Sequence, residues 1–345
     1  MSERRGWLDR GVGETRAVVT LDGRPERLII ERDGEPAAQA LGARLVARIR
    51  SVERAQALAF LDLGEGPDAV LNISAEMGRI DSGGWAEIEI RTQARTGKGA
   101  QARWLGPAEG PRRILSPGST LEERLAALAL GVGIETGPAA RAMADAAQDE
   151  ALETVFPLPG GGTVCVETTR ALTAVDVDIG QRPGSGAKRV ARTANLTALA
   201  TAARVLRLKG LGGLVAIDLA GRGHDASTLL AAARSAFAAD NPGVAFAPVS
   251  RFGVLELTIP RRARPTLDIL CGGGRTSTHM TVAMTLIRAL EREALTDGGG
   301  QFEALAGPPI ASAAAPALRR LVDRHGDRLS IRAEAGRDDF EITRR

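Results

Sequence analysis

A strand–helix–strand pattern over residues 172–220 constrains the fold of this chain more than any other feature. The stretch LTAVDVDIG alternates apolar and polar residues, and LVAIDLA is a short apolar run, so each indicates a strand. Between them, residues 188–209 carry apolar side chains along one stripe at helical spacing. Because a crossover helix of this length returns the chain to the same end of a sheet, the two strands should be parallel.

Three aspartates lie on these two strands. Asp176 and Asp178 are two residues apart and therefore project from one face of their strand. Asp218 ends the next strand, where open α/β sheets place ligands, so we expect the three carboxylates to converge. Clustered carboxylates repel one another unless a cation or a proton neutralises them, and Mg²⁺ prefers oxygen ligands. The alternative is that Asp176 and Asp178 only cap turns or pair with neighbouring arginines.

The segment between Asp178 and Asp218 is strongly basic and contains no acidic residue, although the net charge of the chain is only +3. Such a run is typical of a solvated helix face. Beside a metal site it would also attract a polyanionic substrate. The glycine-rich loop GQRPGSGAKR within this segment lacks the GK[ST] ending of a nucleotide P-loop, so we expect a mobile loop that leads into the crossover helix.

The rest of the chain divides by its periodicity. Short alternating strands with Gly and Asp turns, from TRAVVTLDG to WAEIEIRTQ, predict a small all-β barrel in the N-terminal third. Helical spacing then predicts a helical connector up to residue 149. A helix over residues 225–240 and the strands VAFAPVS and GVLELTI should extend the central sheet, and the chain should end in a small αβ domain.

Composition limits the class of protein. A chain of 345 residues is too long for one small core. Cys165 and Cys271 are its only cysteines and lack metal-ligand spacing, so we expect a reduced, cytoplasmic setting without a zinc site or a disulfide framework. No apolar run reaches the roughly 18 residues that a membrane span needs, and MSERRGWLDRG lacks the apolar core of a signal peptide.

Three stretches carry a resemblance to a known family: LPGGGTVCVETTRALTAVDVDIG, TANLTALATAARVLRLKGLGGLVAIDL and VSRFGVLELT. Together they resemble the catalytic region of the ribonuclease E/G family of bacterial endoribonucleases. The segment GARLVARIRSVERAQALAFLDLGEGPDAVLN resembles the S1-type barrel of that family, which binds single-stranded RNA, and TVAMTLIRALEREAL resembles its small domain.

The resemblance implies an α+β/α/β multidomain fold with an S1-type (OB-fold) β-barrel, a DNase I-like mixed α/β catalytic sheet and a small C-terminal αβ domain. It implies five segments: N-terminal strands that pack on the catalytic part (1–34), the S1-like barrel (35–106), a helical connector in place of the 5′-sensor region (107–150), the DNase I-like catalytic domain (151–270), and a linker with the small C-terminal domain (271–345).

For the catalytic site, the resemblance implies that Asp176 and Asp218 ligate a catalytic Mg²⁺, with Mn²⁺ as a substitute. The metal would activate a water to attack the scissile phosphate. Asp178 is a third candidate catalytic residue and stands where the family has an asparagine that orients the second aspartate. This departure adds a negative charge that could recruit a second ion, shift the metal preference or impair the site.

For RNA binding, the resemblance places Phe60 at a base-stacking position and Lys98 at an RNA-contacting position of the barrel. Val70 replaces the second stacking aromatic of the family. The alternatives are an ordinary barrel core residue for Phe60 and a solvated turn lysine for Lys98. Three residues of the basic loop and helix start are also predicted to contact RNA: Arg182, Lys188 and Arg189.

Two departures concern assembly and regulation. Cys271 stands alone in CGGG, where the family has paired cysteines that share a zinc between subunits, so zinc-linked dimerisation is not expected and a homodimer stays open. The Arg-Thr pair of the family's 5′-monophosphate sensor is not identifiable, because Glu135 precedes Thr136 in GVGIETG. We expect 5′-end sensing to be lost or rebuilt.

The sequence therefore predicts a shortened, cytoplasmic, Mg²⁺-dependent endoribonuclease that cuts single-stranded RNA. One alternative is a catalytically impaired RNA-binding or regulatory protein of the same fold. Another is a metal-dependent phosphohydrolase of small nucleotides, in which the barrel would be architectural. Retention of Asp176 and Asp218 favours the enzyme over the binding protein, and an exposed Phe60 on an intact barrel would favour RNA over a small nucleotide.

Overall fold

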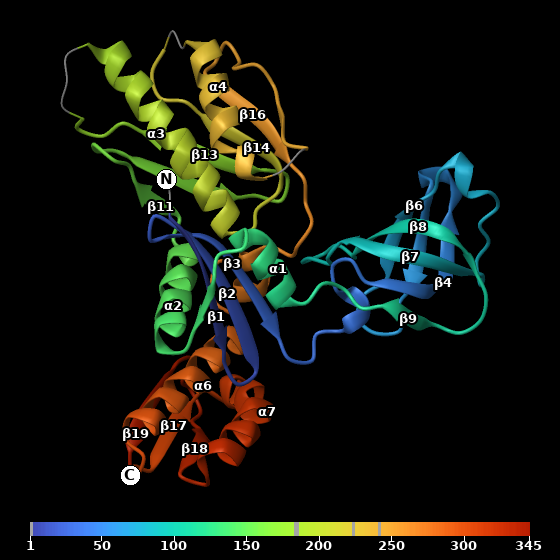
Figure 1. Ribbon diagram of the computed structural model, residues 1–345, viewed down its shortest axis with the longest axis vertical. Helices are drawn as coiled ribbons and strands as arrows, with labels where there is room; N and C mark the ends of the chain where they lie inside the picture. The colour runs from blue at the N-terminus through green and yellow to red at the C-terminus, as the bar shows by residue number, and fades with distance from the viewer. Residues whose placement is uncertain (1–2, 183–185, 223–224, 241–242) are drawn as a thin grey trace.

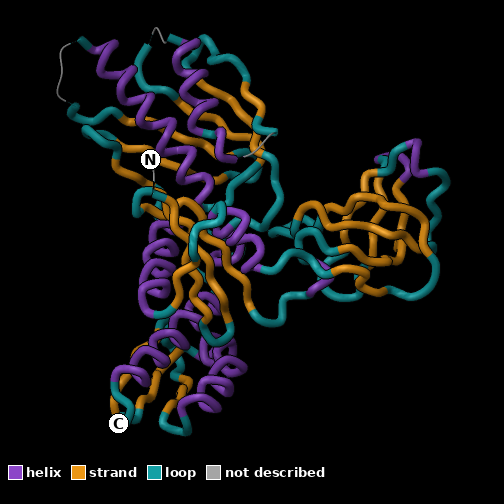
Figure 2. Tube along the Cα trace, viewed as in Figure 1, coloured by secondary structure: helices purple, strands orange, loops and turns teal. Residues whose placement is uncertain are grey.

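The computed structural model describes residues 3–182, 186–222, 225–240 and 243–345. Figure 1 shows a central layer of N-terminal strands with a barrel beside it, a mixed sheet with its helices at one end and a small C-terminal αβ lobe at the other. Figure 2 shows the same division of helices and strands along the trace. In the part of the chain that is described, no helix is both long enough and apolar enough to span a bilayer.

A closed barrel forms beside the central layer. Its strands follow the order β5-β6-β8-β7-β4, and pairing of β5 with β4 closes the ring. Alanine, leucine and isoleucine side chains at alternate positions fill the interior. A small all-β barrel is confirmed, but the pattern placed too many strands in it: TRAVVTLDG and RLIIERDG belong to the separate four-stranded sheet of the central layer. The barrel strands are β4 (Arg44–Glu53), β5 (Leu58–Asp62), β6 (Ala69–Asn72), β7 (Trp85–Thr92) and β8 (Gln101–Ala108). A further strand, β9 (Arg113–Ser116), pairs with β4.

The central layer is a four-stranded sheet with a helix on each face. Helix α1 begins at a capping box between Thr120 and Glu123 and packs on Ala17 and Val19, whereas α2 packs on Val18 of the opposite face. The segment predicted as a helical connector therefore contains both helices, but also the short strands β9 and β10. The elements of this layer are β1 (Arg4–Arg10), β2 (Glu14–Leu21), β3 (Arg24–Arg32), β10 (Ile134–Thr136), α1 (Leu121–Ala129) and α2 (Pro138–Leu152).

The mixed sheet contains the predicted strand–helix–strand unit. Its strand order is β11-β12-β13-β14-β16-β15, and β13 and β14 are parallel, as the crossover predicts. Helices α3 and α4 lie together on one face (Figure 1), where they cover the valines and isoleucines of the central strands. The elements are β11 (Val155–Pro157), β12 (Thr163–Thr168), β13 (Thr173–Asp178), α3 (Ala187–Leu208), β14 (Gly213–Asp218), α4 (Ala226–Ala236), β15 (Ala245–Phe246) and β16 (Val254–Ile259).

The chain ends in the expected small αβ lobe, with strand order β18-β17-β19. A buried ion pair joins this lobe to the central layer, because Arg288 Nη1 donates to Glu14 Oε1 at 2.7 Å. The last elements are α5 (Thr266–Cys271), α6 (His279–Thr296), β17 (Phe302–Ala306), α7 (Pro308–His325), β18 (Leu329–Ala333) and β19 (Phe340–Arg344).

Lys209 ties the end of α3 to the end of α2. Its side chain is only 1% exposed, and its Nζ donates to the carbonyl oxygen of Ala151 at 2.9 Å and to that of Glu153. The ring of Phe156 lies 5.4 Å from the ammonium group. Burial lowers the pKa of Lys209 to about 8, against the attraction of Glu153.

This lowered pKa predicts a pH dependence of stability. Between pH 8 and the usual pKa of 10.5, the unfolded chain binds a proton that the folded chain has lost, so stability rises with pH. We expect the free energy of unfolding of the wild type, measured relative to Lys209→Met by urea denaturation, to increase by about 1 kcal/mol from pH 7.5 to 9. The control is Lys188→Met, because Lys188 is exposed. If the difference in unfolding free energy between wild type and Lys188→Met changes with pH as much as that between wild type and Lys209→Met, the pH dependence does not come from Lys209.

Candidate active site

The main feature of the mixed sheet is a pair of aspartates on its open face. Asp176 and Asp218 are direct partners in the parallel pairing of β13 and β14, whose backbones lie about 4.8 Å apart. Their neighbours Val175 and Ile217 are buried on the opposite face, under α3, so both carboxylates are exposed on the uncovered face. No hydrogen bond or ion pair joins either carboxylate to another described residue.

A cysteine on the next strand lies beside Asp176. Cys165 of β12 is the cross-strand partner of Asp176 on the side away from Asp218. Burial raises the pKa of the Cys165 thiol, and the negative charges of Glu167 and Asp176 raise it further. The thiol is therefore protonated at neutral pH. It adds no third charge to the site.

Asp178 does not join the pair. Its Oδ1 accepts a hydrogen bond from the backbone N–H of Gly180 at 2.9 Å, which closes the turn after β13. Across the described ranges, no three His, Cys, Asp or Glu side chains gather closely enough to hold a metal ion. The expected convergence of three carboxylates is therefore wrong, and the structure brings together only Asp176 and Asp218. The predicted catalytic role of Asp178 stays a prediction.

Two adjacent carboxylates can still hold a divalent cation. Mg²⁺ typically binds proteins through one or two carboxylates and keeps several waters, which a phosphate substrate can replace. The pair of Asp176 and Asp218 has this donor set, and its carboxylate oxygens are not engaged by other described side chains. The residues thus fit a hard cation at the open edge of the sheet.

A residue that the sequence analysis missed fixes the chain behind Asp218. Asn195 of α3 is buried, donates through Nδ2 to the carbonyl oxygen of Ala220 at 3.0 Å, and accepts through Oδ1 from the N–H of Ala220 at 2.9 Å. The signal in the sequence is one amide side chain within the apolar stripe of α3. Asn195 therefore positions the segment that follows Asp218.

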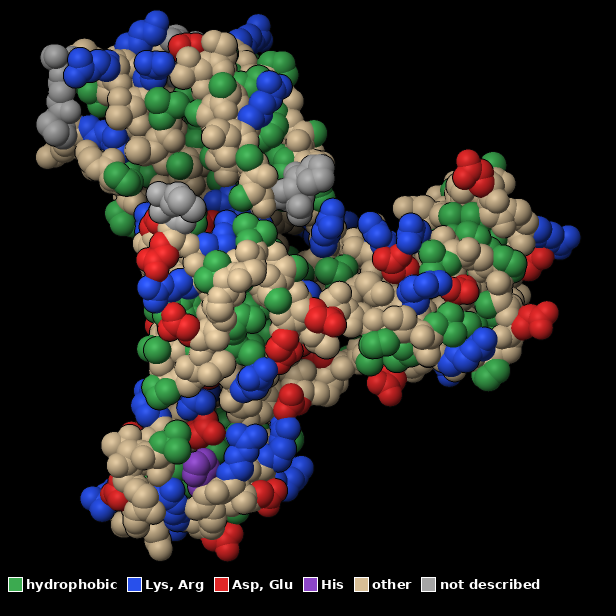
Figure 3. All heavy atoms as spheres, viewed as in Figure 1, with side chains coloured by type: hydrophobic (Ala, Val, Ile, Leu, Met, Phe, Trp, Pro, Cys, Tyr) green, Lys and Arg blue, Asp and Glu red, His purple; other side chains and the backbone are tan. Residues whose placement is uncertain are grey.

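Lys188 and Arg189 are exposed in the first turn of α3. The N-cap residue Gly186 offers no side-chain acceptor, and this turn contains no acidic residue. Positive charges near the partial positive charge of a helix N-terminus are unfavourable, and together they attract an anion. Figure 3 shows basic side chains at the end of the lobe where α3 begins.

Arg182 differs from the other two predicted RNA contacts of the loop. Its Nε donates to the carbonyl oxygen of Gly161 at 2.7 Å, and its Nη2 donates to that of Pro159 at 2.8 Å and to Thr197 Oγ1 at 3.2 Å. The guanidinium therefore ties two loops to α3. Residues 183–185, at the centre of the loop predicted to be mobile, lie outside the described residues.

On the barrel, Phe60 lies on the outer surface of β5, because its neighbours Ala59 and Leu61 fill the interior. The ring is half-buried, so Phe60 is not a barrel core residue. Its cross-strand partner is Val70, the residue that replaces the second stacking aromatic. The exposed Lys98 is nearby, two residues before Ala100, whose carbonyl oxygen accepts from Val70 N–H at 2.7 Å.

The turn that carries Lys98 also contacts the part of the protein outside the barrel, which we call the body. Thr96 N–H donates to Asp268 Oδ2 of α5 at 2.9 Å, and the preceding strand is held by Gln93, whose N–H donates to the carbonyl oxygen of Arg262 at 2.8 Å. Lys98 therefore lies at the junction between the barrel and the body.

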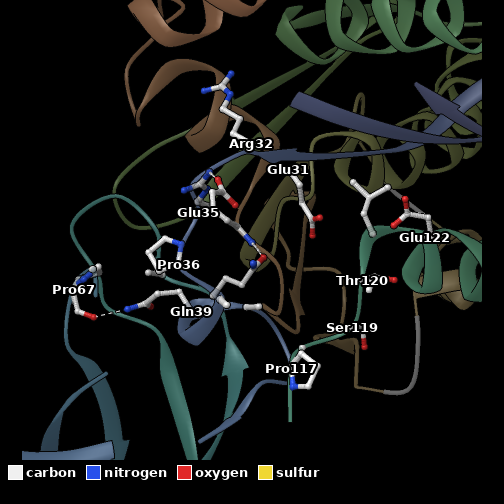
Figure 4. Close-up of a pocket in the computed structure, with 18 residues that line it drawn as sticks. Glu31, Arg32, Glu35, Pro36, Gln39, Pro67, Pro117, Ser119, Thr120 and Glu122 are labelled. Carbon is white, nitrogen blue, oxygen red and sulfur yellow. Dashed lines mark hydrogen bonds and ion pairs between the residues drawn. The ribbon is translucent and has the colours of Figure 1, made fainter. Parts of the chain in front are cut away.

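A cavity of about 530 Å³ lies between the barrel and the central sheet, away from the aspartate pair. Figure 4 shows Glu31, Glu35 and Glu122 at this cavity, where Gln39 donates to the carbonyl oxygen of Pro67 at 2.8 Å. Burial raises the pKa of Glu31, and the charges of Glu35 and Glu122 raise it further, against the attraction of Arg124. Arg32 and Arg264 also line the cavity, and Arg264 pairs with Glu35 at 2.6 Å, so its walls carry charges of both signs.

The middle of the chain is similar to known proteins. Residues 139–262 match the model of the ribonuclease E/G family. Ribonuclease E of Escherichia coli (strain K12) is 30% identical over 175 residues, which are 48% of this chain and 16% of that protein. Ribonuclease G of Salmonella typhimurium (strain SL1344) is 27% identical over 173 residues, 47% of this chain and 35% of that protein. The matched part thus spans about a third or less of these two relatives.

The geometry around Asn195 gives a stability prediction. Asn195→Ala removes the side-chain partner of the part-buried N–H and carbonyl of Ala220, so we expect the free energy of unfolding to fall by about 1–3 kcal/mol in urea denaturation. Asn72→Ala, at the exposed end of β6, is the matched control and should change it by less than about 0.5 kcal/mol. Equal, small effects of the two substitutions would show that Asn195 does not hold this segment.

Proposed function

Because the chain belongs to the ribonuclease E/G family, we propose that it is an endoribonuclease that hydrolyses phosphodiester bonds in single-stranded RNA with the help of a divalent cation. The observation that carries this proposal is the in-register pair of Asp176 and Asp218, which lies inside the matched region on an open sheet face. The proposed cation is Mg²⁺, with Mn²⁺ as a substitute.

The domain assignment is part of the same proposal. The mixed α/β architecture with a closed five-stranded barrel is compatible with an OB-fold joined to α/β domains. We assign residues 35–106 to an S1-type barrel, 151–270 to a DNase I-like catalytic domain and 271–345 to a linker and small domain. Strands of residues 1–34 pack on the catalytic part, with residues 107–150 as the connector.

Each side chain of the site has a separate task. The cation, when bound, supplies a Lewis acid and lowers the pKa of a coordinated water. Asp176 and Asp218 supply the negative charge that holds it. Asp178 closes the turn after β13, and Asn195 fixes the chain after Asp218, so both aspartate backbones are anchored immediately beyond the pair.

Single-stranded RNA fits the surfaces around the site. Phe60 offers a partly exposed ring on the outside of the barrel, and Lys98 offers an exposed cation at the junction with the body. Lys188 and Arg189 place two positive charges at the start of α3, beyond the carboxyl end of β13. Stacking on an aromatic ring combined with a basic surface is how proteins bind single strands without reading their sequence.

One specific observation favours the regulatory alternative. Val70 faces Phe60 across the strand pair, so the outer surface of the barrel offers one ring there and not two. A protein with this surface, and with Asp178 in the place of the family asparagine, could bind RNA without cutting it. Cleavage with a metal series separates the two functions.

The first test removes one carboxylate of the pair. Asp218→Asn should lower the rate of internal cleavage of a fluorescent single-stranded RNA about a thousandfold, because the cation stabilises charge in the transition state by several kcal/mol. The dissociation constant for the same RNA should stay within about threefold. Glu256→Gln is the matched control, since Glu256 is exposed on the same sheet face but pairs with Ala216 and should leave cleavage unchanged.

Two outcomes would contradict the proposal. Cleavage by Asp218→Asn at the wild-type rate would show that the pair does not hold the cation. If the wild type binds RNA but does not cut it with Mg²⁺ or Mn²⁺, the regulatory alternative replaces the enzyme.

The second test concerns the barrel. Phe60→Ala should weaken binding of a single-stranded oligonucleotide about five- to tenfold in fluorescence anisotropy, because base stacking on an aromatic ring contributes about 1–3 kcal/mol. Phe60→Trp should retain binding. Leu115→Ala, an exposed apolar residue of β9, serves as the control. Binding that is unchanged in Phe60→Ala would exclude this ring from the RNA surface.

A further inference from the structure

An exposed aromatic side chain lies near the aspartate pair. Phe252 is 76% exposed, although the chain has only seven phenylalanines, three tryptophans and no tyrosine. An exposed Phe is unfavourable in water, since burying such a ring contributes about 1.5–3 kcal/mol. Neither the sheet core nor the aspartate pair explains its position at the tip of a turn.

The turn that presents Phe252 is held by Ser250. The N–H of Ser250 donates to the carbonyl oxygen of Val254 at 2.9 Å, and the N–H of Gly253 donates to that of Ser250 at 3.0 Å. Ser250 Oγ also accepts from the N–H of Phe252 at 3.3 Å and from that of Val254 at 3.2 Å. Gly253 takes a φ of +89°, which a glycine adopts without strain. The ring is therefore carried by a well-defined turn.

This turn is joined directly to the strand that ends in Asp218. Val254 is the cross-strand partner of Asp218, and the N–H of Leu219 donates to the carbonyl oxygen of Gly253 at 3.0 Å. Phe252 lies two residues before Val254, in the turn that leads into β16, so its backbone is at the end of β16 that lies beside Asp218. The ring and the carboxylate pair are at the same edge of the sheet.

Arg251 accompanies the ring. Its guanidinium carbon lies 4.7 Å from the centroid of Phe252, within the range of a cation–π contact. The side chain is exposed, and no described Asp or Glu forms an ion pair with it. The guanidinium covers one face of the ring, which leaves the other face for a planar ligand. Its charge suits a phosphate.

We propose that Phe252 and Arg251 form a base-stacking subsite for the nucleotide next to the scissile phosphate. The ring stacks on the base, and the guanidinium contacts a phosphate of the same strand. This inference rests on the proposed function and adds a contact for the substrate at the catalytic edge, separate from Phe60 on the barrel. Phe252 positions the substrate and does not contact the reacting atoms, which lie at the aspartate pair.

The test compares three substitutions at one position. Phe252→Ala should lower kcat/KM for a single-stranded RNA about tenfold, Phe252→Leu should lower it nearly as much, and Phe252→Trp should restore it, because stacking needs a π surface and not only apolar area. Leu295→Ala, which removes an exposed apolar side chain from α6, is the matched control and should have no effect. Unchanged melting temperatures should show that all variants are folded.

A set of RNAs that each lack one base locates the contact. One abasic position beside the cleaved bond should slow the wild type about tenfold, and the same position should have no further effect on Phe252→Ala. Rates of Phe252→Ala within twofold of wild type on all RNAs would overturn the proposal. That result would also be found if the ring instead docks on a protein partner.

A binding measurement separates this proposal from the proposed hydrolysis. A 2-aminopurine base placed along an uncut single-stranded oligonucleotide should be quenched by wild type and by Phe252→Trp, and not by Phe252→Ala. If the wild type never cuts RNA but this pattern is found, the stacking subsite is retained and the nuclease proposal fails. If the wild type cuts RNA and no position shows a Phe252-dependent change, only the subsite fails.

Discussion

The register of β13 against β14 is the constraint on which the candidate site depends. A slip of one residue would turn Asp218 toward α3 and Ile217 toward solvent, since the side chains of a strand alternate between its faces. That slip would bury an unpaired carboxylate and expose an isoleucine, and both changes are unfavourable by several kcal/mol. The hydrophobic core under α3 and α4 therefore fixes the position of the aspartate pair.

Helix α3 links this pair to the rest of the protein. Its length makes the crossover that renders β13 and β14 parallel, and Asn195 within it anchors the chain after Asp218. At its C-terminal end, Lys209 bonds to carbonyl groups at the end of α2, and through α2 the helix is connected to the N-terminal sheet. A displacement of α3 would thus disturb both the core and the site. This coupling is mechanical, through packed and hydrogen-bonded elements, and needs no separate signalling pathway.

Residue patterns predicted the parts of the fold that depend on local periodicity and on general rules of chain connection. The parallel pair follows from strand alternation, a helix of sufficient length and the handedness of crossovers. The turn bond of Asp178 could not be predicted in the same way, because an aspartate two residues before a glycine can cap a turn or bind a ligand. Strands β9 and β10 are short and exist only through tertiary pairing, so their residues carry no strand signal.

The hydrogen bonds and the exposure of individual side chains were the features that the sequence predicted least well. Arg182 belongs to a basic loop in the sequence, and only the folded chain shows that its guanidinium is bonded to two carbonyl groups and a threonine. Phe252 was part of a motif that indicated the family, but exposure is a property of the turn and not of the motif. The barrel carries Val70, and not a second aromatic ring, opposite Phe60, whereas the structure shows the exposed ring of Phe252 at the edge of the sheet beside the aspartate pair.

The shape of the site bears on the size of its substrate. Sites for small molecules are concave and bury most of the ligand, which a small nucleotide would need for affinity. Here two cavities, of about 530 and 720 Å³, lie at the barrel junction and between β1, α2 and α6, whereas Asp176 and Asp218 are exposed on an open sheet face. An open face provides few contacts to one nucleotide. A substrate must therefore gain affinity from protein residues far from the aspartate pair, such as Phe60 and Lys98. Linked contacts raise the effective concentration of the scissile bond at the carboxylates. A polymer satisfies this requirement and a mononucleotide does not, which favours RNA over a small nucleotide as the substrate.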